Sequence, residues 1–136
     1  MLIPRVLATE AALALIDTLK EEHGPLLFHQ SGGCCDGSAP MCYPIGEFRI
    51  GVNDVYLGEV GGCAFYMGGA QFDYWQHTQL TLDVVPGRGS GFSLEAPGGV
   101  RFIVRSRVFG EDELRSLPVL RRGPQLGRPT RTRTPT

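Results

Sequence analysis

The chain has 136 residues, of which 42% are hydrophobic and 20% charged, and its formal net charge is -1. This composition is that of one ordinary globular domain, and no apolar run approaches the roughly 20 residues that a membrane-spanning helix needs. The 19 glycines and 10 prolines predict many turns and a β-rich fold with little helix.

The first predicted element is an amphipathic helix over residues 9–23. Thr9 can cap its start, and Gly24 followed by Pro25 stops it. Its apolar face is built from residues at helical spacing, namely Ala12, Leu15, Ile16 and Leu19. We then expect a short buried strand at residues 26–30. A long loop that carries three cysteines is expected at residues 31–46.

The rest of the body predicts mainly strands. They are expected at residues 48–50, 55–60, 63–67, 78–85, 92–95 and 100–109, with a short helical turn at 70–76. The expected fold is α+β, with the N-terminal helix packed on a mostly antiparallel β-sheet or sandwich.

Charge divides the chain into a domain over residues 1–114 and a tail over residues 115–136. Every acidic residue lies at or before Glu113, and six arginines follow it. The tail is rich in proline, so we expect it to be disordered. It has no aromatic residue to stack on bases, and a solvated tail is therefore favoured over one that binds nucleic acid.

The chemistry-bearing residues gather in the loop. Cys34, Cys35 and Cys42 lie within nine positions, among glycines that let the backbone fold back on itself. Thiolates suit zinc, copper(I), iron or an iron–sulfur cluster. Their spacing is neither that of a zinc ribbon nor that of a ferredoxin, so the pattern predicts metal or redox chemistry without selecting the ion.

His29 lies five residues before Cys34, and two interpretations of it stay open. It could be a fourth ligand or orient one, or it could be a core histidine with an internal partner. Cys63 stands alone in a predicted strand, and we expect it to be buried. Nothing near the start resembles a signal peptide, so we expect a cytoplasmic protein whose cysteines are thiols or ligands and not disulfides.

Several motifs together resemble a bacterial family of unknown function, domain of unknown function family 779. They are HQSGGCCDGS at residues 29–38, PMC at 40–42, QFDYW at 71–75, HTQL at 77–80 and DVVPGRG at 83–89. The resemblance covers roughly residues 9–110. Genes of that family often lie beside aldehyde dehydrogenase genes, so the resemblance implies an accessory role with an aldehyde dehydrogenase as a candidate partner.

A second resemblance concerns shape. The leading helix, the strand, the Gly-Gly-Cys loop and the late strand after residue 91 look like the HesB-like fold of A-type iron–sulfur carriers. Those proteins have a loop cysteine that would fall on Cys34 or Cys35, and two more near the C-terminus. This chain has no cysteine after Cys63, so a metal here would need Cys34, Cys35 and Cys42 as a local set.

The leading hypothesis is a small metal-binding or thiol-redox accessory protein of alcohol and aldehyde metabolism, working through Cys34, Cys35 and Cys42 with His29. One alternative is an interaction or maturation factor for an aldehyde dehydrogenase without metal chemistry of its own. Another is an enzyme with Cys34 or Cys35 as nucleophile and His29 as base. The number of subunits stays open, and a homo-oligomer is compatible with all three.

Overall fold

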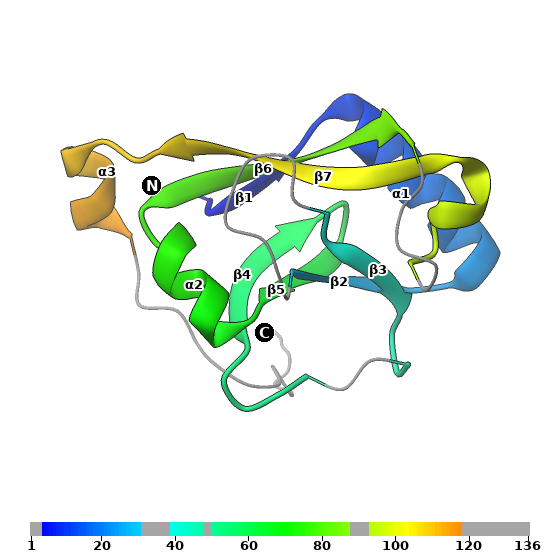
Figure 1. Ribbon diagram of the computed structural model, residues 1–136, viewed down its shortest axis with the longest axis horizontal. Helices are drawn as coiled ribbons and strands as arrows, with labels where there is room; N and C mark the ends of the chain where they lie inside the picture. The colour runs from blue at the N-terminus through cyan, green and yellow to red at the C-terminus, as the bar shows by residue number, and fades with distance from the viewer. Residues whose placement is uncertain (1–3, 31–38, 48–49, 88–92, 118–136) are drawn as a thin grey trace.

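The computed structural model describes residues 4–30, 39–47, 50–87 and 93–117. In this part of the chain two sheets lie one above the other (Figure 1). The three-stranded sheet has the order β1 (Val6–Ala8), β6 (Thr78–Pro86), β7 (Val100–Val108). The four-stranded sheet has the order β3 (Met41–Pro44), β2 (Leu26–Gln30), β5 (Cys63–Met67), β4 (Val55–Val60).

Helices complete the described part. They are α1 (Glu10–His23), α2 (Gly69–Trp75), α3 (Glu111–Ser116) and the short 3-10 helix η1 (Ala96–Gly98). Within the described ranges, no helix combines the length and the apolar character needed to cross a membrane.

The expected mixed, sheet-dominated fold is confirmed, but its finer description is not. Strand pairs β2/β3, β4/β5 and β6/β7 are antiparallel, whereas β1/β6 and β2/β5 are parallel. The expected helix on a single sheet is replaced by a helix that touches both: α1 packs against β6 and against the turn between β4 and β5. The reason is that each sheet has an apolar face, and the two faces bury each other.

Helix α1 begins and ends where its sequence predicts. Thr9 Oγ1 accepts a hydrogen bond from the Ala12 amide at 3.1 Å, and Gly24 ends the helix at a φ of 79°. The buried side of α1 lies on Gly61, whose φ is +56° and where an added Cβ would come within 3.1 Å of Ile16. Only glycine fits that close approach without strain.

Three aromatic rings join the sheets. Phe28 of β2 stacks on Phe65 of β5, with ring centroids 5.9 Å apart. It also meets the ring of Phe102 of β7 edge-on, with centroids 5.0 Å apart and planes at 88°. All three side chains are fully buried, so this contact forms the centre of the core.

Some expected elements are absent or displaced. Residues 93–95 are bend and turn leading into η1, so the strand expected at 92–95 is wrong over that part. Instead of a backbone ladder, these residues make side-chain bonds: Ser93 Oγ accepts the Cys42 amide of β3 and donates to Glu95, whose other oxygen accepts the Phe102 amide of β7. Strands β1 and β3 and helix α3 were not expected from the sequence, and residues 48–49 of another expected strand lie outside the described residues.

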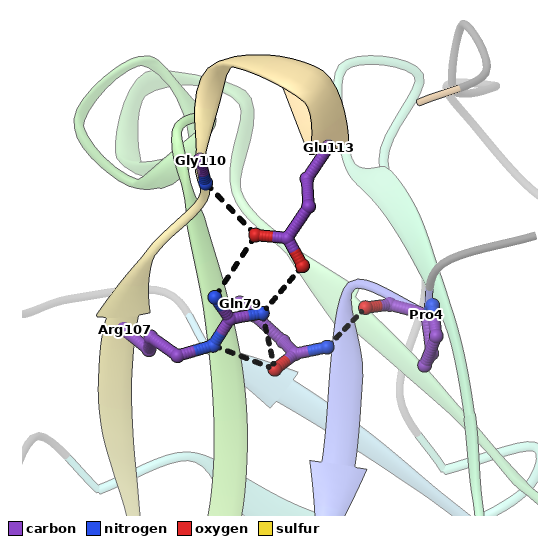
Figure 2. Close-up of polar contacts among 5 residues, drawn as sticks. All are labelled: Pro4, Gln79, Arg107, Gly110 and Glu113. Carbon is purple, nitrogen blue, oxygen red and sulfur yellow. Dashed lines mark hydrogen bonds and ion pairs between the residues drawn. The ribbon is translucent and has the colours of Figure 1, made fainter. Parts of the chain in front are cut away.

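A cluster of hydrogen bonds and an ion pair connects helix α3 to strands β6 and β7 (Figure 2). Arg107 of β7 donates to both carboxylate oxygens of Glu113, at 2.9 and 3.0 Å, and to Gln79 of β6. Glu113 also accepts the Gly110 amide, and Gln79 donates to the Pro4 carbonyl. The expected boundary between residues 114 and 115 falls inside α3, and residues 118–136 lie outside the described part.

Candidate functional site

The structure describes both sides of the cysteine loop but not its centre. Cys34 and Cys35 belong to residues 31–38, which lie outside the described residues. His29 is the fourth residue of β2 and lies five positions before Cys34, and Cys42 is the second residue of β3 and lies seven positions after Cys35. The loop therefore starts at the end of a central strand and returns along an edge strand of the same sheet.

The two described candidates, His29 and Cys42, point to opposite faces of that sheet. Cys42 lies directly opposite Phe28 in the antiparallel pair β2/β3, and both belong to the buried core. His29 is the next residue along β2, and successive side chains of a strand alternate between faces. His29 shares its face with Met41, the residue opposite it on β3. The structure does not bring His29 and Cys42 together.

Cys42 is enclosed by the core. Its side chain is 0% exposed, and burial raises the pKa of its thiol, with the Glu95 carboxylate and the Cys63 thiol adding to the shift. The backbone is held as well, because the Cys42 amide donates to Ser93 Oγ at 2.9 Å. Ser93 Oγ donates in turn to Glu95, whose other oxygen accepts the Phe102 amide at 3.2 Å. A thiol held protonated in this way is a poor nucleophile and a poor ligand.

Cys63, as expected, is also a buried thiol. It lies at the start of β5 with 1% exposure, and burial raises the pKa of its thiol as well. The two cysteines that the structure describes are therefore core residues.

The opposite face of the sheet holds a histidine–carboxylate pair. His29 Nε2 lies 3.0 Å from Asp54 Oδ1, and the two side chains are 5% and 15% exposed. Asp54 directly precedes β4, and its carboxylate reaches across β5 to the histidine on β2. Its second oxygen accepts the Gly51 amide at 2.7 Å.

Side chains of three strands flank this pair. Pairing places Met41 of β3, His29 of β2 and Tyr66 of β5 side by side, followed by Tyr56 of β4. The ring centroids of Tyr56 and Tyr66 are 5.5 Å apart. Burial raises the pKa of the Tyr56 phenol to about 12. The result is a largely buried row that contains a thioether, an imidazole and two phenols.

The metal prediction stays a prediction. Among the residues that the structure describes, no three histidine, cysteine, aspartate or glutamate side chains are grouped for one ion, but Cys34 and Cys35 are not among those residues. Sequence reasoning did not select Asp54, which lies between the strands expected at residues 48–50 and 55–60. No local pattern marks the contact, because Asp54 meets His29 only through the pairing of β2, β5 and β4.

The model of one protein family matches this chain. It is described as Domain of unknown function (DUF779), and it matches residues 15–108, which is more than half of the chain. The chain belongs to this family. The family resemblance stated from the motifs is thereby confirmed, and the description assigns the family no activity.

Two further comparisons produced no match. No curated protein and no solved structure is significantly similar to the chain. The HesB-like resemblance is therefore not confirmed.

Proposed function

We propose that this protein is a small metal-binding or thiol-redox accessory protein whose chemistry is carried by Cys34 and Cys35 together with His29. The observation that carries the proposal is the buried pair that Asp54 makes with His29, a residue near the end of β2 and five residues before Cys34. A histidine held by a carboxylate is an arrangement that proteins use to support metal ligands and to activate thiols.

Cys42 is not part of the proposed group of reactive residues. Its side chain lies on the face of the sheet opposite His29, and its thiol is enclosed by core residues. Two adjacent thiols and an imidazole are a donor set for zinc, copper or iron, and the same two thiols could instead cycle between reduced and oxidised forms. The link with an aldehyde dehydrogenase rests on the family resemblance alone and is part of this proposal only as the partner to test first.

The experiment is elemental analysis of the full chain purified without oxygen, combined with titration of its accessible thiols. The metal-binding form predicts close to one zinc, copper or iron per chain, lost in both Cys34→Ser and Cys35→Ser and retained in Cys42→Ala. The redox form predicts no metal but an intramolecular disulfide on treatment with a small disulfide oxidant, absent from either serine variant. If the chain holds no metal and neither Cys34 nor Cys35 reacts as a thiol, the proposal is refuted.

A second candidate, a cysteine-dependent enzyme, is favoured by the same pair. Asp54 would orient His29, which would take the proton of one cysteine. This arrangement needs only one of the two thiols. It predicts rapid alkylation at a single cysteine, slowed in His29→Ala and unaffected by serine at the neighbouring position. Equal dependence on both cysteines would exclude it in favour of the redox form.

A further inference from the structure

We infer that residues 93–95 form a latch between the two sheets, and that this latch opens while the rest of the domain stays folded. The latch bonds to Cys42 of β3 and to Phe102 of β7, and both of these strands lie at the edge of their sheet. Opening of the latch uncovers the outer edge of β3 together with the Cys42 thiol. The fold thus contains a conformational device that exposes a core cysteine without global unfolding.

The latch occupies the free edge of β3. The Cys42 amide donates to Ser93 Oγ at 2.9 Å, and the Cys42 carbonyl accepts the Leu94 amide at 3.1 Å. Both backbone groups of Cys42 therefore point away from β2, and the latch satisfies both of them. A strand edge that is covered in this way cannot pair with another chain at that position, so the closed latch also protects the edge.

The same segment holds the free edge of β7. One oxygen of the Glu95 carboxyl group accepts the Ser93 hydroxyl, and the other accepts the Phe102 amide at 3.2 Å. Ser93 and Glu95 are each only 2% exposed. The Ser93 hydroxyl therefore bonds directly to the edge of one sheet and, through Glu95, to the edge of the other. Its removal should break the polar connection between the sheets on this side.

The opposite side of the two sheets is closed by apolar packing instead. There β1 of the three-stranded sheet contacts β4 of the four-stranded sheet. The approach is close, because a Cβ added at Gly58 of β4 would lie 3.5 Å from Val6 of β1. Val6 belongs to the buried core. One side is thus held by core packing, whereas the other depends on the hydrogen bonds of the latch.

Opening the latch breaks few contacts. The strand pairs β2/β3 and β6/β7 stay intact, because the latch belongs to neither of them. Opening removes the bonds to Cys42 and Phe102 and the packing of Leu94, which is only partly buried against the core. A segment with few buried apolar contacts opens at a lower free energy than the whole domain.

The buried carboxyl group of Glu95 lowers the free energy of opening further. Among the residues that the structure describes, no ion pair joins Glu95 to a lysine, arginine or histidine. A carboxyl group gives up its hydration when it is buried, and the two donors that it meets here replace only part of that hydration. Opening returns Glu95 to water and so offsets part of the bonding that is lost. The latch side should therefore open before the side formed by β1 and β4.

The test compares the alkylation rates of Cys42 and Cys63 in the folded full chain, each divided by the rate of the same thiol in the unfolded chain. Mass spectrometry follows both rates at increasing urea concentrations below the unfolding transition. Cys63 is 1% exposed on the interior strand β5 and reports opening of the core. We expect Cys42 to react at least about tenfold faster than Cys63. Its rate should also depend less on urea, because opening of the latch exposes less surface. A Cys42 rate at or below that of Cys63, with the same urea dependence, would overturn the inference.

Three variants assign the opening to the latch. Ser93→Ala should raise the Cys42 rate about 5- to 100-fold, the effect of losing one buried hydrogen-bond partner. Ser116→Ala makes the same substitution at an exposed serine of α3 and should leave that rate unchanged. Thr9→Ala removes the cap of α1 but leaves every latch bond in place, so it should raise the Cys63 rate and not the Cys42 rate.

An unchanged Cys42 rate in folded Ser93→Ala would overturn the inference, and so would a Cys42 rate that rises in Thr9→Ala as much as the Cys63 rate does. If Ser93→Ala does not fold, the urea series on the wild type and the Thr9→Ala variant still decide. Both readouts are independent of the proposed function.

Discussion

The edge-on contact between Phe28 and Phe102 should be measurable as a coupling between the two sheets. Phe28→Leu keeps most of the apolar volume, so repacking should cost below about 1.5 kcal/mol. It also removes the ring contacts to Phe65 and Phe102, worth about 0.5–1.5 kcal/mol each. We therefore expect Phe28→Leu to lower the free energy of unfolding by about 2 kcal/mol, and Phe102→Leu by somewhat less.

A double-mutant cycle isolates the contact between the sheets. Urea unfolding of wild type, both single variants and the double variant, followed by fluorescence of the buried Trp75, should give a coupling of about 0.5–1.5 kcal/mol. Val52→Ala is the control, because Val52 is 78% exposed, and it should change stability by less than about 0.5 kcal/mol. Additive effects of Phe28→Leu and Phe102→Leu would refute the packing of β2 on β7.

Three other substitutions test the polar contacts. Thr9→Ala removes the cap of α1 and should lower stability by about 1–2 kcal/mol in a urea titration; an unchanged midpoint would contradict the cap. Ser93→Ala leaves the buried Glu95 without one donor and should cost about 1–3 kcal/mol, and a neutral effect would show that the bond is not made. Arg107 lowers the pKa of Glu113 to about 2, so their pairing stabilises the fold above the ordinary glutamate range and is lost as pH falls. The difference in melting temperature between wild type and Glu113→Gln should therefore shrink from about pH 5 to pH 2, and a constant difference would argue against the pairing.

Elements that depend on neighbouring residues could be predicted from the sequence. Helix α1 has its apolar spacing, its Thr9 cap and its Gly24 stop within one short segment. Strands β2, β4 and β5 match the predicted ranges because each is a short, largely apolar run between turn residues. In these segments local preference and tertiary packing favour the same structure.

Elements that depend on distant partners were missed. Strand β1 has only three residues and is stabilised by pairing with β6, far along the chain. Strand β3 pairs with β2 inside a stretch whose glycines, prolines and cysteines predict a loop. The sequence predicts a strand that includes Ser93, but the buried hydroxyl of Ser93 bonds to the Cys42 amide and to Glu95. Local sequence contains none of these long-range contacts.

The candidate site shows the same division. Sequence proximity placed Cys42 with Cys34 and Cys35, but the register of β3 against β2 turns Cys42 into the core. The same register leaves His29 on the other face, where Asp54 reaches it across β5. A histidine before a cysteine-rich segment was recognisable from the sequence, whereas its carboxylate partner required the sheet order.

The central claim is that the reactive thiols are Cys34 and Cys35, while Cys42 and Cys63 belong to the core. The most direct measurement is the alkylation rate of each cysteine in the folded full chain, followed by mass spectrometry with and without added zinc. The account predicts fast labelling at Cys34 and Cys35, slowed by zinc if they bind it, and very slow labelling of Cys42 and Cys63, whose thiols are buried with raised pKa values. Labelling of Cys42 as fast as that of Cys34 or Cys35 would contradict it.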